Sequence, residues 1–177
     1  LILIDAGCEY GNYASDVTRT FPAGKKFSSE QKDLYQIVLE SQLKALGEIK
    51  PGKTFLDAHI KAVKVIVEGL KYVGLLKGST EKIIKNGDYK KFYMHKTGHW
   101  LGLDVHDAGP YVDEKGKSIK LKAGMVTTLE PGIYTSNSLD IPIRCRGIGI
   151  RIEDDVLVTS RGNDVLTKGT PKTVKEI

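Results

Sequence analysis

The sequence is short of the residues that mark several common classes of protein. Its 177 residues include only two cysteines, Cys8 and Cys145, which lie far apart and outside any CxxC motif. A zinc knuckle or a thioredoxin-type redox site therefore has no support. Because no signal peptide is visible and cytosolic thiols are normally reduced, we expect two free thiols in a cytoplasmic protein.

Long apolar runs, repeats and linkers are also missing. No stretch approaches the roughly 18 apolar residues that cross a bilayer, so we expect no membrane partner. There is no strong internal repeat, low-complexity tract or Pro-rich linker, and the length suits one domain with a sizeable core. The net charge of +5 comes from 27 basic and 22 acidic residues, but the lysines are scattered and not interleaved densely with aromatic residues, so we expect no nucleic-acid partner.

The two ends of the chain are rich in strand signals. Residues 1–21 predict two strands joined by a turn at Gly11–Asn12. Residues 126–129 and 148–157 predict further strands. The chain opens inside the apolar run LILID without an initiator Met, so we expect it to be a piece of a longer protein.

The middle of the chain predicts helices. Ser28 with Gln31, and Thr54 with Asp57, have the spacing of capping boxes. An apolar stripe at helical spacing follows each, and the stripe of the first helix comprises Leu34, Ile37, Val38, Leu43 and Leu46. The first helix should end before Pro51 and the second near residue 74, with a short third helix at 81–85. This order predicts an α+β fold, a mostly antiparallel sheet backed by helices.

Four carboxylates lie beside apolar strand residues, where charged groups are unusual. They are Asp5, Asp16, Glu130 and Glu153. A buried ionised carboxylate is costly unless it is paired or bound to a metal. Taken singly, each could be an exposed residue at a strand end or the partner of Arg19 or Arg151, but four such acids together are harder to explain in this way.

Three of the four histidines gather in one segment, HKTGHWLGLDVHD, as His95, His99 and His106. They could be polar loop residues or hydrogen-bonded core residues. Gly98 and Gly102 argue against a regular helix here, and the Glu of the helical zinc-protease motif is absent.

Four carboxylates and an imidazole form an oxygen-rich ligand set, which suits Mn²⁺ or a related ion better than a sulfur-rich zinc site does. The set has enough oxygens to bridge two ions, which can activate a water molecule as a nucleophile. The remaining histidines could hold a carbonyl or move protons. The residues alone therefore predict metal-assisted hydrolysis without naming the substrate.

Four segments, in order, resemble the aminopeptidase P family of the creatinase and methionine aminopeptidase group, which has the pita-bread fold. They are LIDAGCEYGNYASDVTRTFP, MHKTGHWLGLDVHDAG, TTLEPGIY and RGIGIRIEDDVLVT. The resemblance runs from residue 1 to about residue 158 and implies that residues 1–177 are the C-terminal part of a metallopeptidase catalytic domain, with the fold incomplete at its N-terminus. The chain end, TPKTVKEI, is also similar to that family.

The resemblance implies a role for each of these residues. Asp5 would bind one metal, His99 and Glu130 the other, and Asp16 and Glu153 would bridge the two ions, most simply Mn²⁺. His95 and His106 would be catalytic and contact the substrate, Tyr134 would line the substrate site, and Arg151 would orient Glu153. A bridging hydroxide would attack the bond before a penultimate proline in a peptide substrate.

Two other functions stay open. A prolidase, which cuts Xaa-Pro dipeptides, shares much of the motif wording. A non-catalytic binding module of the same fold would hold no ordered metal. The oligomeric state is also open, and a homo-oligomer is compatible with the sequence.

Overall fold

The computed structural model describes residues 1–177, and its first element is a long β-hairpin. Strand β1 (Ile2–Ala6) pairs antiparallel with β4 (Val17–Phe21), so that Asp5 lies opposite Thr18. The short strands β2 (Glu9–Tyr10) and β3 (Tyr13–Ala14) continue the hairpin to its turn. Gly11 and Asn12 both have positive φ, 59° and 69°, as a tight hairpin turn requires. The predicted pair of strands and the turn are confirmed.

Three helices follow, and the two predicted capping boxes are present. Helix α1 (Ser29–Leu46) is capped by Ser28, whose side chain accepts from the Gln31 N–H. Helix α2 (Phe55–Tyr72) is capped by Thr54, whose side chain accepts from the Asp57 N–H. Helix α3 (Thr80–Asn86) ends at Gly87, and the single turns of 3₁₀ helix are η1 (Asp88–Lys91) and η2 (Ile143–Cys145).

The apolar faces of α1 and α2 pack together and against the sheet. Leu34, Val38 and Ile66 are buried in this core, with Ile150 from the sheet. The prediction that Leu43 belongs to the buried stripe is wrong, because its side chain is 49% exposed. At about 100° a residue it lies roughly half a turn round the helix from Leu34.

The remaining strands form small antiparallel sheets. Strand β5 (Val126–Leu129) pairs with β8 (Asp154–Val158), which also pairs with β9 (Asn163–Val165). Strand β6 (Gly132–Tyr134) pairs with β7 (Gly149–Arg151). The prediction of one strand over residues 148–157 is wrong, because the chain changes its pairing partner at residues 152–153. Strand β7 pairs with β6, whereas β8 pairs with β5.

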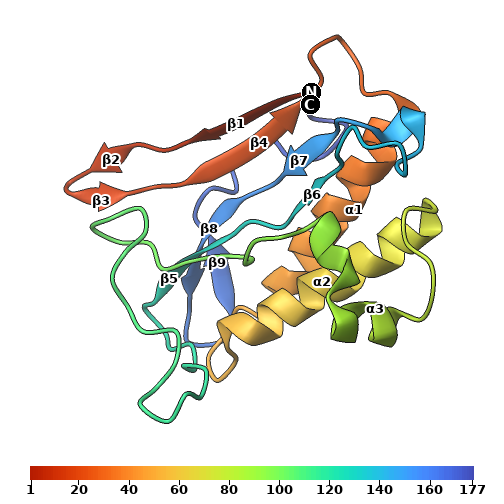
Figure 1. The fold of residues 1–177 in the computed structure, drawn as a ribbon. Coiled ribbons are helices and arrows are strands. Elements are labelled where there is room, and N and C mark those ends of the chain that lie inside the picture. The colour runs from red at the N-terminus through yellow and green to blue at the C-terminus, as the bar shows by residue number, and fades with distance from the viewer.

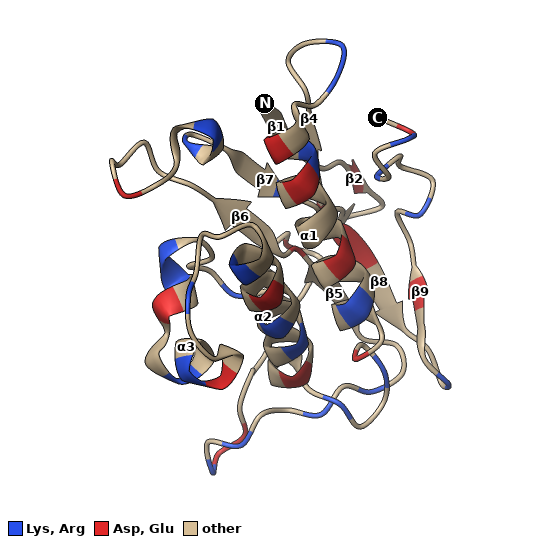
Figure 2. Ribbon diagram, turned by 90° about the vertical axis from the view of Figure 1, so that its right-hand side faces the viewer, with Lys and Arg blue, Asp and Glu red and all other residues tan.

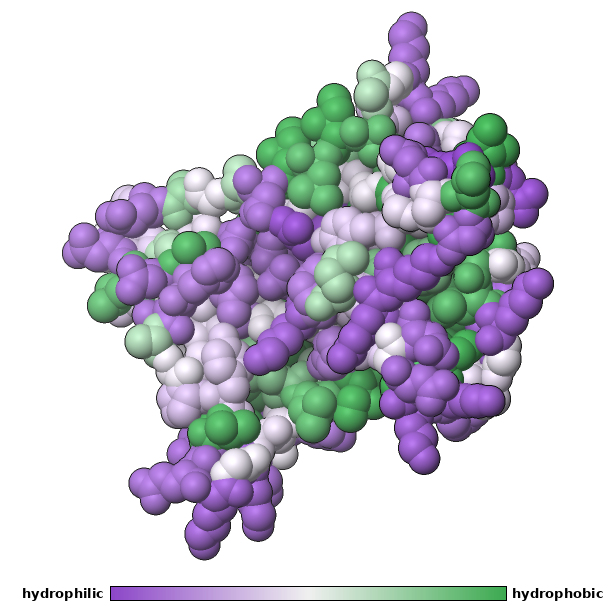
Figure 3. Space-filling view, in the orientation of Figure 1, coloured by the Kyte–Doolittle hydropathy of each residue, from purple (hydrophilic) through white to green (hydrophobic).

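The hairpin runs along one side of the molecule and the helices along the other, with the remaining strands between them (Figure 1). This arrangement confirms the predicted α+β class of antiparallel strands backed by helices. Basic and acidic residues are mixed over the outer helix faces (Figure 2). Hydrophobic and hydrophilic groups alternate over the face in Figure 3, and no helix is long and apolar enough to span a bilayer.

Candidate metal centre

Three side chains from distant parts of the sequence meet between the hairpin and the central strands. Asp16, His99 and Glu153 each offer a ligand atom, and these atoms lie within 4.8 Å of one another. Asp16 immediately precedes β4, and Glu153 lies at the break between β7 and β8. The Glu153 N–H donates to the Thr18 carbonyl, so the break in the strand directs this side chain towards the hairpin.

His99 is placed by a close approach of its segment to β5. A Cβ on Gly98 would lie 2.2 Å from the carbonyl oxygen of Thr128, so only glycine fits there. His99 follows Gly98 in the chain, and its main-chain carbonyl accepts the Thr128 N–H at 3.0 Å. The glycine that argues against a helix in the sequence is therefore needed to bring the imidazole to the sheet.

The orientation of the His99 ring suits a cation. Its Nδ1 lies 2.9 Å from the Trp100 carbonyl oxygen, which can only accept, so Nδ1 carries a proton. Nε2 then faces the Asp16 Oδ2 at 3.4 Å. Nε2 therefore presents its lone pair towards the carboxylate side of the cluster, and an imidazole oriented through Nδ1 in this way is a common metal ligand.

Glu130 and Asp5 lie beside these three residues. The Glu130 Oε1 is 3.8 Å from the His99 Nε2, and its main-chain N–H donates to the Thr97 carbonyl. Asp5 forms an ion pair with Arg151 and keeps 48% of its side chain exposed. Asp5 therefore matches the alternative of an exposed acid paired with Arg151, and it lies at the open edge of the cluster.

The crowding of carboxylates raises their proton affinities. Burial, with a contribution from nearby Glu130, raises the pKa of Glu153 to about 8. Burial also raises the pKa of Glu130 to about 7, and burial together with the adjacent Asp5 raises the pKa of Asp16. These groups therefore need protons or cations to stay together at neutral pH, and this donor set fits divalent ions.

The other predicted residues form a polar chain along the cluster. Arg151 donates to the Tyr134 hydroxyl at 3.4 Å, and Tyr134 donates to the His95 Nε2 at 2.9 Å. The His95 Nδ1 faces the Lys96 carbonyl at 2.7 Å, and burial lowers the pKa of His95. His95 is therefore a neutral ring held in one orientation.

His106 differs from His95, because its side chain is exposed. Its ring packs edge-on against the His99 ring, with centroids 4.4 Å apart. The structure thus brings all nine predicted residues into one region, although Arg151 does not bond directly to Glu153.

Thr18 makes the link between Arg151 and Glu153. Its hydroxyl donates to the Glu153 Oε2 at 2.6 Å and accepts from the Arg151 Nε at 3.1 Å. Asp155 is a second addition, because its Oδ2 accepts the Asp16 main-chain N–H at 3.1 Å. Spacing could have pointed to Thr18, which is two residues from Asp16 and so on the same strand face, but not to Asp155.

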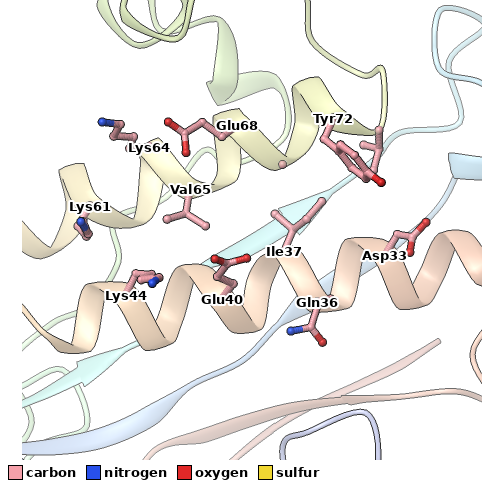
Figure 4. A pocket seen from close by; sticks show the side chains of 12 residues that line it. Asp33, Gln36, Ile37, Glu40, Lys44, Lys61, Lys64, Val65, Glu68 and Tyr72 are labelled. Atoms are coloured by element: carbon pink, nitrogen blue, oxygen red, sulfur yellow. The ribbon is translucent and has the colours of Figure 1, made fainter.

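A separate groove lies between α1 and α2. It has a volume of about 580 Å³, and acids and lysines of both helices line it, among them Glu40, Glu68 and Lys61 (Figure 4). None of the nine predicted residues lines this groove. It is therefore distinct from the cluster of histidines and carboxylates.

With this geometry established, comparison with known proteins identifies the family. Residues 1–160 match metallopeptidase family M24. The chain belongs to metallopeptidase family M24. It is 46% identical over all 177 residues to an Xaa-Pro aminopeptidase of Haemophilus influenzae and to one of Escherichia coli. These matches confirm the resemblance drawn from the motifs.

Solved structures agree with the sequence relatives of this M24 chain. Aminopeptidase PepP of Pseudomonas aeruginosa superposes with a TM-score of 0.96 at 52% identity, and an Escherichia coli aminopeptidase P with a TM-score of 0.93 at 45% identity. Each comparison covers 98% of this chain and 39% of the other. The predicted pita-bread fold is confirmed, and the chain spans about two fifths of the length of its curated relatives, 41% and 40% for the two bacterial enzymes.

Proposed function

We propose that this chain carries the metal centre of an Xaa-Pro aminopeptidase, a hydrolase that removes an N-terminal residue from peptides with proline at the second position. One combined observation supports the proposal. A chain 46% identical throughout to Xaa-Pro aminopeptidases holds Asp16, His99 and Glu153 with ligand atoms within 4.8 Å.

The proposed ligands are the five residues read from the sequence. Asp16 and Glu153 would bridge two divalent ions, Asp5 would complete one site, and His99 with Glu130 the other. The oxygen-rich set favours Mn²⁺. When bound, such ions supply Lewis acidity and an activated water molecule as nucleophile at neutral pH.

The chain's own residues would then bind and orient the peptide. Tyr134 and His95 share one hydrogen bond, and Arg151 anchors the hydroxyl of that pair. This arrangement would hold the His95 ring and the Tyr134 side chain in fixed orientations where the peptide binds. His106, exposed next to His99, would contact the peptide from the open side and exchange protons with it.

Hydrolysis of matched peptides by the full-length protein tests this function. We expect the wild type to bind metal and to cleave an Xaa-Pro-Xaa tripeptide after its first residue. Asp16→Asn should lose metal binding and cleavage together. Asp33→Asn on α1 is the matched control, because Asp33 is exposed and lines the groove between α1 and α2, away from the nine site residues. Cleavage of the dipeptide alone would show a prolidase, and absence of bound metal in the wild type would show a binding module.

A further inference from the structure

Behind the metal centre, a buried guanidinium joins three parts of the chain. Arg19 is only 3% exposed and sits on β4, three residues after Asp16. Its Nη1 donates to the main-chain carbonyl of Glu153, and its Nη2 to the Asp154 Oδ1 at 2.8 Å. On its other side it donates to the carbonyls of Thr170 at 3.1 Å and Pro171 at 2.9 Å.

The C-terminal segment, residues 167–172, is held to the same point by side chains. The Thr167 hydroxyl donates to the Asp154 Oδ1 at 2.8 Å, and the Lys172 ammonium forms an ion pair with the Asp154 Oδ2. The Lys172 carbonyl accepts from the Tyr35 hydroxyl of α1 at 2.8 Å. This segment therefore covers Arg19 and closes the network of hydrogen bonds.

The network fixes the main chain of Glu153 at a position where regular strand pairing does not. Glu153 lies between β7 and β8, so neither strand partner fixes its peptide group. Its N–H bonds to the Thr18 carbonyl and its C=O to Arg19. Both main-chain groups of Glu153 are thus held by adjacent residues of β4, the strand that Asp16 precedes.

We propose that Arg19, with the C-terminal segment packed over it, is a positioning residue that aims the Glu153 carboxylate at Asp16 and His99. Its guanidinium has five donors in a rigid plane, and here they reach Thr18, Glu153, Asp154, Thr170 and Pro171. A lysine keeps the charge but cannot span this set. The inference rests on the proposed metal-binding function and adds a role for residues remote from the ions.

Stability alone is a weak explanation for such a group. A buried ion pair often stabilises a fold no better than apolar residues of similar volume. A positioning role predicts instead that metal affinity falls when the guanidinium is replaced, because mutation of residues that orient metal ligands typically lowers metal affinity 10- to 100-fold.

Calorimetric titration of Mn²⁺ into the metal-free, full-length protein tests this role. We expect Arg19→Lys to bind Mn²⁺ 10- to 100-fold more weakly than the wild type, again by the effect of groups that orient ligands. Lys172→Met, which loosens Asp154 from its outer side, should weaken binding less. Lys168→Met is the matched control, because Lys168 pairs only with exposed Asp164 and should bind as the wild type does.

Thermal unfolding of the metal-free proteins separates the two explanations. A lower melting temperature in Arg19→Lys with unchanged Mn²⁺ affinity would overturn the positioning role while leaving the proposed function intact. A wild type that binds no Mn²⁺ would overturn both. If Arg19→Lys does not fold, Lys172→Met decides, and unchanged affinity in that variant overturns the role.

Discussion

At the scale of single residues, the centre depends on groups that hold the ligands as much as on the ligands. The Thr18 hydroxyl satisfies one Glu153 oxygen and receives one Arg151 donor. A carboxylate oxygen has a second lone pair, so this bond orients Glu153 without preventing it from binding an ion.

Replacement of this hydroxyl should therefore weaken metal binding. We expect Thr18→Val to lower the affinity for divalent ions about tenfold, the lower end of the range for such groups, and Thr18→Ser to restore it. Calorimetric titration measures both. The control is Thr20→Val, two residues along the same strand and equally buried, whose hydroxyl bonds the main chain of Arg151. Equal affinities in Thr18→Val and Thr20→Val would contradict the assignment.

Most ligand candidates could be recognised from the sequence for a physical reason. An acid beside an apolar strand, or a histidine between glycines, is an unusual residue for its sequence neighbours, and this can be seen from the sequence alone. Thr18 carries no such conflict, and the bonds that Thr18, Arg19 and Asp155 make could not be assigned, because their partners come from segments more than a hundred residues away. Only the folded chain shows what they hold.

At the scale of elements, local chemistry predicted the hairpin and the helix starts. Capping boxes and turns are made by residues that are close in sequence. Ser28 and Thr54 were therefore enough to predict the helix N-termini, and Gly11 the hairpin turn. The break at residues 152–153 was missed because pairing partners determine it. Apolar residues lie on both sides of the acids at 153–155, in β7 and in β8, and the sequence does not show that the pairing partner changes there from β6 to β5.

The contact between α1 and α2 gives an element-scale prediction. A Cβ on Gly69 of α2 would lie 2.5 Å from the Ile37 Cγ2 of α1, and a β-branched side chain has little freedom to move. We expect Gly69→Ala to destabilise the protein by about 1–3 kcal/mol, as overpacking does, despite the better helix propensity of alanine. Urea unfolding measures this change.

The double variant provides the test of that explanation. Ile37→Ala removes the methyl groups that a new Cβ would meet, so Gly69→Ala should cost less in that background. An equal cost in both backgrounds would show that the helix contact is not the cause.

At the scale of the whole molecule, protons and metal ions compete for the cluster. The raised pKa values of Glu130 and Glu153, about 7 and about 8, mean that the metal-free folded state binds more protons than the unfolded chain above the ordinary carboxyl pKa. The free energy of unfolding should therefore fall as pH rises from about 5 to about 8.

Divalent ions should reverse this trend, because they bind the deprotonated groups. At an ion concentration of about 100 times Kd, binding adds about 2.7 kcal/mol to the free energy of unfolding. Urea unfolding of the full-length protein at pH 5.5 and pH 8, with chelator or with Mn²⁺, measures both effects. A metal-free stability that rises between these two pH values would contradict the proton uptake described here.

The break that delivers Glu153 to the hairpin also sets an order of events during synthesis. The hairpin and both helices consist of local contacts and can form as the chain emerges. Asp16 cannot meet Glu153 until the ribosome has added that residue, 137 positions later. The segment that covers Arg19 is added after that. A nascent chain would thus have most of this scaffold before it could bring all five proposed ligands together, so we expect divalent ions to bind this centre only after this region has been translated.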